Sequence, residues 1–168
     1  MANIIAAHFG DIAHAELRIL LANRALTKAG LADHATAHED VLTANAVTYT
    51  LDGVFYSKAA VAQIEVSTLA VLDETGSVKS IVAQAIGATR VYLLALDSAG
   101  VVKIVQAADV ATTTSSSNVP GCPRGYAPFG AVKIVNASAA AFIFGTTSKT
   151  AVGITASYFD VSLAPETL

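Results

Sequence analysis

Charge is the first thing that this sequence has little of. Of its 168 residues, 14% are charged and 54% are hydrophobic, and the formal net charge is −3. A typical soluble domain has about 25% charged residues. A free globule of this size needs a charged surface to stay apart from its neighbours. The composition therefore favours a membrane protein or a subunit whose surface is buried against other subunits.

Long apolar runs are missing as well. A membrane-spanning helix needs about 20 consecutive apolar residues, and the best stretch, Ile81 to Leu96, is interrupted by Gln84 and Arg90. Positions 1–10 contain no basic region and no long apolar run, so we expect no secretory signal. We therefore favour burial between subunits, and we expect no membrane partner.

Basic clusters, cysteine pairs and cofactor motifs are also lacking. The Lys and Arg residues are scattered singly, which argues against a nucleic-acid partner. The single cysteine, Cys122, excludes an intramolecular disulfide and agrees with a reducing compartment. The chain contains no phosphate-binding loop, no dinucleotide fingerprint and no nucleophile elbow. We expect no cofactor and no small-molecule substrate.

The N-terminal region contains the clearest helical pattern, which predicts a helix over residues 11–29. Asp11 is a suitable N-cap, and Gly30 stands where a left-handed C-terminal residue is expected. Apolar residues fall on more than one side of this helix, which fits packing within one domain or against a neighbouring subunit as well. The residues that we expect to contact another subunit are Ile12, Leu17, Ile19, Leu20, Leu21 and Leu26.

Residues 45–110 are typical of β-strands. The segment Thr48 to Ser57 has Asp52-Gly53 at its centre, which is a strong signal for a tight hairpin turn. A second hairpin is predicted from Arg90 to Val105, around a four-residue loop that ends in Gly100.

Two further stretches have weaker patterns. Residues 59–71 are ambiguous, and we predict a strand there. Residues 112–125 begin with a Thr/Ser run and contain two prolines, so they are expected to form a loop. Later strands are predicted at Gly130 to Val135, Ala141 to Phe144, and Ile154 to Ser162.

These elements together predict a mainly β fold, either a β-sandwich or a small β-barrel of antiparallel hairpins, with an N-terminal α-helix. We divide the chain into a helical arm, residues 1–45, and a β domain, residues 46–168. Residues 100–107 and 130–137 have similar sequences. This similarity fits two equivalent edges of one sheet, and it equally fits chance likeness between apolar strands.

One spacing suggests a metal site. His34 and His38 are four residues apart and Glu39 follows, so a helix would place both imidazoles on one face. The order differs from that of zinc proteases, in which Glu follows the first His. We interpret both histidines as surface residues and expect no metal.

The remaining reactive groups also favour structural interpretations. Cys122 lies between Gly121 and Pro123, where a helix N-terminus that would activate a thiol is not expected. The adjacent carboxylates Glu39-Asp40 and Asp73-Glu74 are expected in turns that face water, without the burial that general acid catalysis needs. The sequence therefore predicts no catalytic residue.

Four strand phrases resemble those of small virion proteins from tailed bacteriophages. The resemblance covers residues 46–165 and leaves 1–45 outside, and Cys122 departs from the pattern. The phrases are VTYTLDGVFYSK (Val47 to Lys58), YLLALDSAG (Tyr92 to Gly100), PRGYAPFGAVKI (Pro123 to Ile134) and GITASYFDVS (Gly153 to Ser162).

This resemblance implies a non-enzymatic structural protein of the virion, of the head decoration or cement type. Such a subunit is expected on the capsid exterior, as a homotrimer that binds the major capsid protein and ties adjacent capsomers together. The apolar residues of the predicted helix 11–29 would then contact another subunit or the capsid. Two alternatives stay open. One is a tail, baseplate or fibre-associated protein that binds a host surface glycan, and the other is a metal-dependent hydrolase built on His34, His38 and Glu39.

Overall fold

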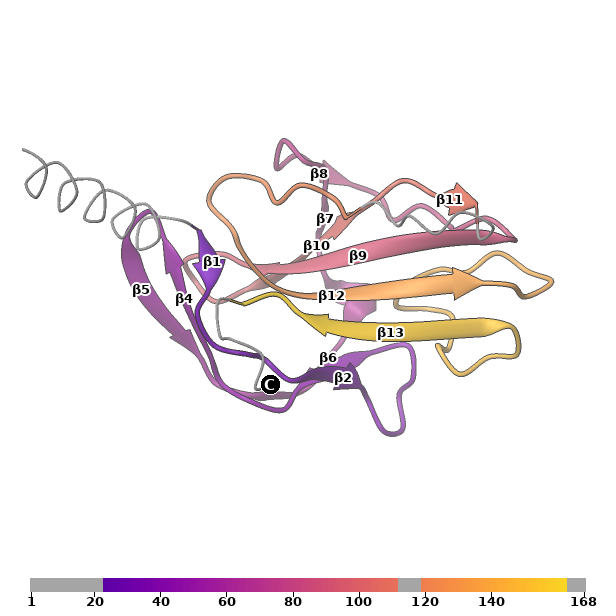
Figure 1. Ribbon diagram of the computed structural model, residues 1–168, viewed down its shortest axis with the longest axis horizontal. Coiled ribbons are helices and arrows are strands. Elements are labelled where there is room, and N and C mark those ends of the chain that lie inside the picture. Colours follow the sequence, from indigo (N-terminus) through magenta and orange to yellow (C-terminus); the bar gives the residue numbers. More distant parts are fainter. Residues whose placement is uncertain (1–22, 112–118, 163–168) are drawn as a thin grey trace, which may run out of the picture.

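The computed structural model describes residues 23–111 and 119–162. The chain is mainly β, with 47% of it in strands, and the sheets do not close into a barrel. They form two layers that pack face to face (Figure 1). The first-layer strands are β1 (Arg24–Ala25), β2 (Leu31–Asp33), β3 (Val41–Thr43), β4 (Val47–Leu51), β5 (Val54–Lys58) and β6 (Val61–Ile64).

The second layer is a seven-stranded sheet with the order β13-β12-β9-β10-β7-β8, in which β11 also pairs with β9. All its pairs are antiparallel except β10 with β7. A short 3-10 helix, Val66–Thr68, lies between β6 and β7. The strands are β7 (Val71–Leu72), β8 (Val78–Lys79), β9 (Ala88–Leu96), β10 (Val102–Gln106), β11 (Val110–Ala111), β12 (Ala127–Asn136) and β13 (Ile154–Asp160).

The first layer is one three-stranded meander, although it divides into the sheets β1-β4-β5 and β2-β3-β6. Arg24 lies opposite Thr50, and Leu31 lies opposite Thr43, so both halves keep the same register. Backbone hydrogen bonds continue between the halves, including one from Ala44 N to the Gly30 carbonyl (3.1 Å). The predicted domain boundary at 45/46 falls between β3 and β4 of this meander.

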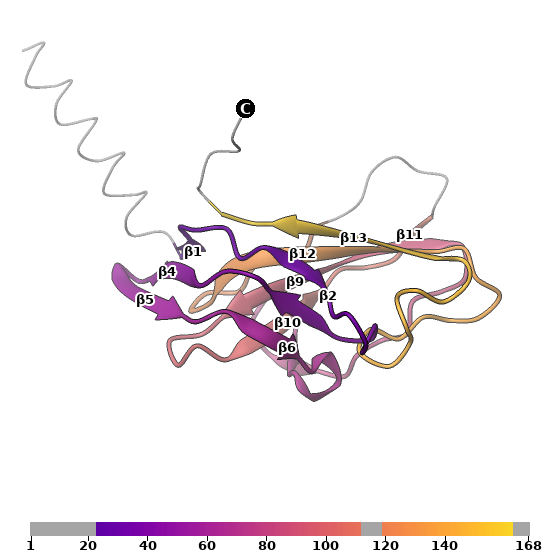
Figure 2. The same ribbon diagram turned by 90° about the horizontal axis from the view of Figure 1, so that it is seen from below.

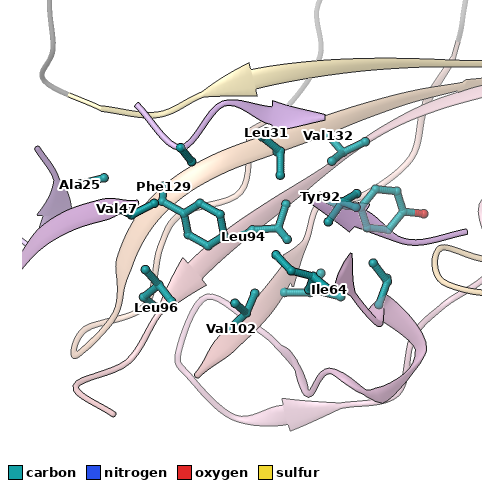
Figure 3. Close-up of a cluster of buried hydrophobic side chains, with 14 of the residues drawn as sticks. Ala25, Leu31, Val47, Ile64, Tyr92, Leu94, Leu96, Val102, Phe129 and Val132 are labelled. Carbon is teal, nitrogen blue, oxygen red and sulfur yellow. The ribbon is translucent and has the colours of Figure 1, made fainter. Parts of the chain in front are cut away.

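The core lies between the two layers (Figure 3). The small layer contributes fully buried side chains such as Val47 and Tyr49, and the large sheet contributes Leu94, Ile104 and Phe129. Each large apolar side chain buried in this way contributes about 1.5–3 kcal/mol before the cost of ordering the chain.

The opposite face of the large sheet is also covered at its centre. Val91, Leu93 and Ala131 form a second buried cluster with residues of β7 and β10, and the loop residues Cys122 and Tyr126 pack against it. As a result all nine residues of β9 are buried. A strand covered on both faces is typically a continuous apolar run, as β9 is from Val91 to Leu96.

Both predicted hairpins are confirmed. β4 and β5 pair around Asp52-Gly53, whose φ angles of 48° and 80° are the left-handed values that this tight turn requires. β9 and β10 pair around the loop that ends at Gly100, whose φ is 74°.

The other strand predictions have mixed outcomes. The strands predicted at 130–135 and 154–162 are confirmed as β12 and β13. Residues 59–71 are strand in part, as β6 and the start of β7. The strand predicted at 141–144 is wrong, because Phe142 makes only an isolated bridge to Gln84 before a turn. Its alternating aromatic pattern reflects Phe142 and Phe144 entering the core from that turn.

The predicted N-terminal helix is not supported. Residues 11–22 lie outside the described residues, and residues 23–29 contain strand β1 and bends in place of a helix. The physical reason is tertiary, because Ala25 is fully buried and pairs with Tyr49 of β4. Gly30 has the expected positive φ, 62°, but it serves the turn before β2.

The similar segments 100–107 and 130–137 have a simple place in the fold. They contain β10 and β12, which pair with opposite edges of the central strand β9. Both are interior strands of a sheet that ends in β13 and β8, so the interpretation as two equivalent edges of the sheet is wrong.

Candidate functional site

A buried lysine lies at the centre of one polar cluster in the described residues. The side chain of Lys149 is 1% exposed, and its ammonium group lies 3.2 Å from Oδ1 of Asp33. It also donates hydrogen bonds to the main-chain carbonyls of His38 and Asp40, the latter at 2.7 Å. A buried charge with an ionic partner and further hydrogen bonds is compensated, so Lys149 acts as a clamp between loops.

Asp33 is the acceptor of this polar cluster, which we call the Asp33 cluster (Asp33, His38, Asp40, Lys149 and Tyr158). Its carboxylate contacts Nδ1 of His38 at 2.6 Å and accepts a hydrogen bond from the Tyr158 hydroxyl at 3.0 Å. Burial raises the pKa of Asp33, but His38, Lys149 and Tyr158 outweigh it and hold that pKa below its ordinary value. Burial and the charge of Asp33 raise the pKa of Tyr158. These pKa shifts favour the carboxylate form of Asp33 and the protonated hydroxyl of Tyr158, which are the forms that make this hydrogen bond.

Asp40 extends the Asp33 cluster into the first layer. Its carboxylate accepts hydrogen bonds from the Gln63 side chain (2.8 Å) and from the main-chain N–H of Val66 (3.0 Å). Together these bonds connect the β2–β3 loop to β6, to the loop that carries Lys149 and to β13. The geometry is that of a structural joint between the two layers.

His34 and His38, which belong to the alternative metal site, are not brought together as ligands. Nδ1 of His34 accepts the N–H of Ala37 (2.9 Å), and Nδ1 of His38 is engaged by Asp33. His34 and His38 lie in the β2–β3 loop, so the helical face assumed for them is absent. Among residues 23–111 and 119–162, no group of three or more His, Cys, Asp or Glu is arranged to hold a metal ion.

A second polar cluster fixes an extended segment beside the large sheet, residues 78–86. Arg90, whose side chain is 4% exposed, pairs with Asp109 (2.7 Å) and donates hydrogen bonds to the carbonyls of Val82 and Ala83. Asp109 also accepts the N–H of Ala85 at 2.9 Å. Sequence reasoning missed this pair, because Arg90 stands within an apolar strand and Asp109 lies 19 residues later.

Gln84 and Asn136 complete the attachment of the 78–86 segment. Both side chains are fully buried, and Gln84 donates to the carbonyls of Ala88 and Ile134. The Asn136 amide donates to the carbonyls of Ala85 (3.2 Å) and Ala140 (3.0 Å). The backbone of this segment is therefore held by side chains of the neighbouring strands.

The 78–86 segment exposes large apolar side chains although its backbone is fixed. Val78 is 72% exposed, Val82 is 56% exposed and Ile86 is 60% exposed. Two hollows of about 320 Å³ each border this segment, and Lys79 lines both. Exposed apolar side chains gathered on one segment are typical of a protein contact surface.

Cys122 lines the hollow of about 610 Å³ that Asn23, Asp52 and Arg124 also border. Burial raises the pKa of the Cys122 thiol to about 11. A thiol with that pKa is protonated at neutral pH, whereas a nucleophilic cysteine must be a thiolate. The structural interpretation of Cys122 is therefore favoured.

The aromatic side chains on strands pack mainly inside. Tyr49 stacks on Tyr56 with ring centroids 5.4 Å apart, and Tyr92 stacks on Phe144 at 4.3 Å. Phe55 (58% exposed) and Phe159 (51%) face outward, on different sheets. The exposed aromatic cluster that a glycan platform needs is not found in the described part of the chain.

The predicted contact residues lie mostly outside the described residues. Ile12, Leu17, Ile19, Leu20 and Leu21 belong to that undescribed part, so their role stays a prediction. Leu26 is half-buried, and its N–H donates to the Thr48 carbonyl (2.8 Å). In this position it belongs to the meander of its own chain.

No helix among the described residues is long and apolar enough to span a membrane. Comparisons of this chain with family models, with curated proteins and with solved structures found no match.

Proposed function

We propose that this protein is a non-enzymatic structural subunit of a tailed-phage particle, of the decoration or cement type on the capsid exterior. Its partners are other copies of itself and the major capsid protein. The resemblance in sequence supports this proposal, because its four phrases form the framework strands β4, β5, β9, β12 and β13. The low charged fraction, 14%, supports it as well.

The exposed apolar side chains of the 78–86 segment, Val78, Val82 and Ile86, are the observation that carries the proposal. Burial of apolar surface contributes about 25 cal/mol per Å² to association before ordering costs. Those costs are small here, because Arg90, Asp109, Gln84 and Asn136 already fix the backbone. Weak contacts of this kind become collectively strong when they repeat across a capsid lattice.

The polar clusters support a structural role in their own way. The buried charged side chains Lys149 and Arg90 are each engaged by a carboxylate and by main-chain carbonyls. Such bonds hold loops and strands in place. The favoured function therefore assigns these groups to stability and not to catalysis.

The proposal is tested with the double variant Val82→Asp/Ile86→Asp and with heads assembled from the major capsid protein of the same phage. The wild-type protein is expected to co-sediment with the heads, and the double variant is expected to stay in the supernatant. Val152→Asp is the matched control, because Val152 is 95% exposed and lies outside the 78–86 segment. Equal co-sedimentation of the double variant, or none by the wild type, contradicts the proposal.

The hollow beside Cys122 favours a second candidate function, glycan binding by a tail or fibre-associated protein. Asn23, Asp52 and Arg124 offer polar groups there, and Tyr126 offers part of an aromatic ring. Binding on a glycan panel that is lost in Asp52→Ala/Arg124→Ala supports this second function. A panel without binding rejects it.

A further inference from the structure

Strand β13 is the longest edge strand of the described sheets. It forms one end of the seven-stranded sheet and pairs with β12 over seven consecutive residues without a bulge. Figure 2 shows its position at the outer side of the second layer. In the described residues no strand pairs with its other edge along this length.

The direction of the backbone groups along β13 follows from one hydrogen bond. Val161 N–H donates to the Phe129 carbonyl of β12 (3.0 Å). In an antiparallel strand the backbone groups alternate between the two edges. Ala156 and Tyr158 therefore direct their N–H and C=O groups outward, whereas Ser157 directs its own toward β12.

The outward-facing edge has defined ends. At its start the N–H of Ile154 is already bonded to the Ala151 carbonyl (3.0 Å). Beyond its end, Ser162 forms a parallel bridge with Ala25 of β1. The available edge thus runs from Ile154 to Asp160, and Ser157 is its central residue.

This edge carries little of the protection that natural sheets use. Long edges are normally blocked by charged residues, prolines or bulges. From 154 to 159 the sequence is ITASYF, without charge or proline. The other edge strands are shorter, and β5 and β8 each end in a lysine, Lys58 and Lys79.

We propose that β13 pairs antiparallel with β13 of a second copy, about a two-fold axis at Ser157. A strand edge of this kind is self-complementary. The N–H and C=O groups of Ala156 would bond to those of Tyr158 in the second copy, and the groups of Tyr158 would bond to those of Ala156 in the second copy. No charged residue faces its own copy across the axis. Phe159, which is 51% exposed, comes to lie opposite the partner's Thr155 on the outer face.

The proposed pairing can be tested by a disulfide cross-link at position 157. The two Ser157 residues form a non-hydrogen-bonded pair, in which Cα atoms are about 4.5 Å apart. That distance is within the range of a disulfide. Ser157→Cys in a Cys122→Ala background is therefore expected to form a covalent dimer under mild oxidation, seen on a non-reducing gel. Thr155→Cys in the same background is the matched control, because Thr155 is more exposed but lies opposite a different residue.

The comparison of the two cysteine variants distinguishes specific strand pairing from cross-linking by random collision. Far more covalent dimer from Ser157→Cys than from Thr155→Cys supports the two-fold contact, and equal or smaller amounts overturn it. Adding Ala156→Pro removes an outward N–H and leaves the β12 ladder intact, so the cross-link should disappear while the thermal midpoint stays near that of the parent. A cross-link that survives in this folded variant also overturns the proposal.

The two-fold contact does not rest on the proposed particle function. It requires only two copies of the chain, and the test uses the purified full-length protein. If heads fail to bind while Ser157→Cys still cross-links, the particle assignment fails and the pairing stands.

Discussion

At the scale of single residues, Lys149 is the side chain on which the joint between the two layers depends most. Lys149→Met removes the cationic partner of Asp33 and one of the donors to the carbonyls of His38 and Asp40. Asp33 is 27% exposed and keeps His38 and Tyr158, so the loss is that of a hydrogen bond to a charged group, about 1.5–3 kcal/mol. We therefore expect the free energy of unfolding to fall by about that amount in urea titrations.

The matched control for this variant is Lys79→Met. Lys79 also pairs with a carboxylate, Asp73 at 3.3 Å, but its side chain is 59% exposed. Exposed pairs contribute about 0–1 kcal/mol. Equal effects of the two substitutions would show that Lys149 is not the clamp described above.

Asp73 makes a pH-dependent contribution to stability within the turn 73–76. Its carboxylate accepts hydrogen bonds from the Thr75 hydroxyl and the Ser77 N–H, which lower its pKa from 3.8 to about 2. Because this pKa is depressed on folding, the contribution is present above the ordinary value and is lost as the pH falls toward 2. NMR titration of the carboxyl carbon should give a midpoint near 2. Thr75→Val should raise that midpoint, and an unchanged midpoint argues against this cause.

At the scale of elements, the Asp52-Gly53 turn is the clearest local signal. Gly53 has a φ of 80°, which an L-residue adopts at a cost of about 1–2 kcal/mol. Gly53→Ala should lower the free energy of unfolding by about that amount. Gly121→Ala is the control, because an added Cβ there meets only Glu74, at 3.7 Å or more. A Gly53→Ala protein as stable as the Gly121→Ala protein would contradict this.

Turns were predictable wherever long strands flank them. The loop 97–100 was recognised, and the loop 73–76 has the same Asp-x-x-Gly pattern and the same hydrogen bonds to its aspartate. A turn was expected at Asp73-Glu74, but the hairpin that it forms was not, because β7 and β8 have only two residues each. Strands that short contain no periodicity, and the same is true of β1. There Leu26 continued the apolar spacing that predicted a helix over residues 11–29.

The polar clusters were beyond sequence reasoning for a different reason. Asp33 and Tyr158 are 125 positions apart, and only the packing of the two layers brings them together. The spacing of His34 and His38 suggested that they act as a pair, yet His38 contacts Asp33. Local spacing indicates shared geometry only where the segment is regular, and this one is a loop.

At the scale of the whole molecule, we relate the low charged fraction to two regions of the large sheet that are suited to contacts with other subunits. Val78 in β8 and strand β13, which has no charge from Ile154 to Phe159, lie at opposite ends of the large sheet. In the proposed function the first would contact the capsid and the second would contact another copy of the protein. Such a subunit would use both ends of one sheet to connect its neighbours.

The central claim, that this protein is a particle component, is tested most directly by quantitative mass spectrometry of purified phage particles separated into heads and tails. The account predicts that the protein is found in the head fraction, in a fixed ratio to the major capsid protein across preparations. Its absence from purified particles, or its presence in the tail fraction alone, would contradict the account.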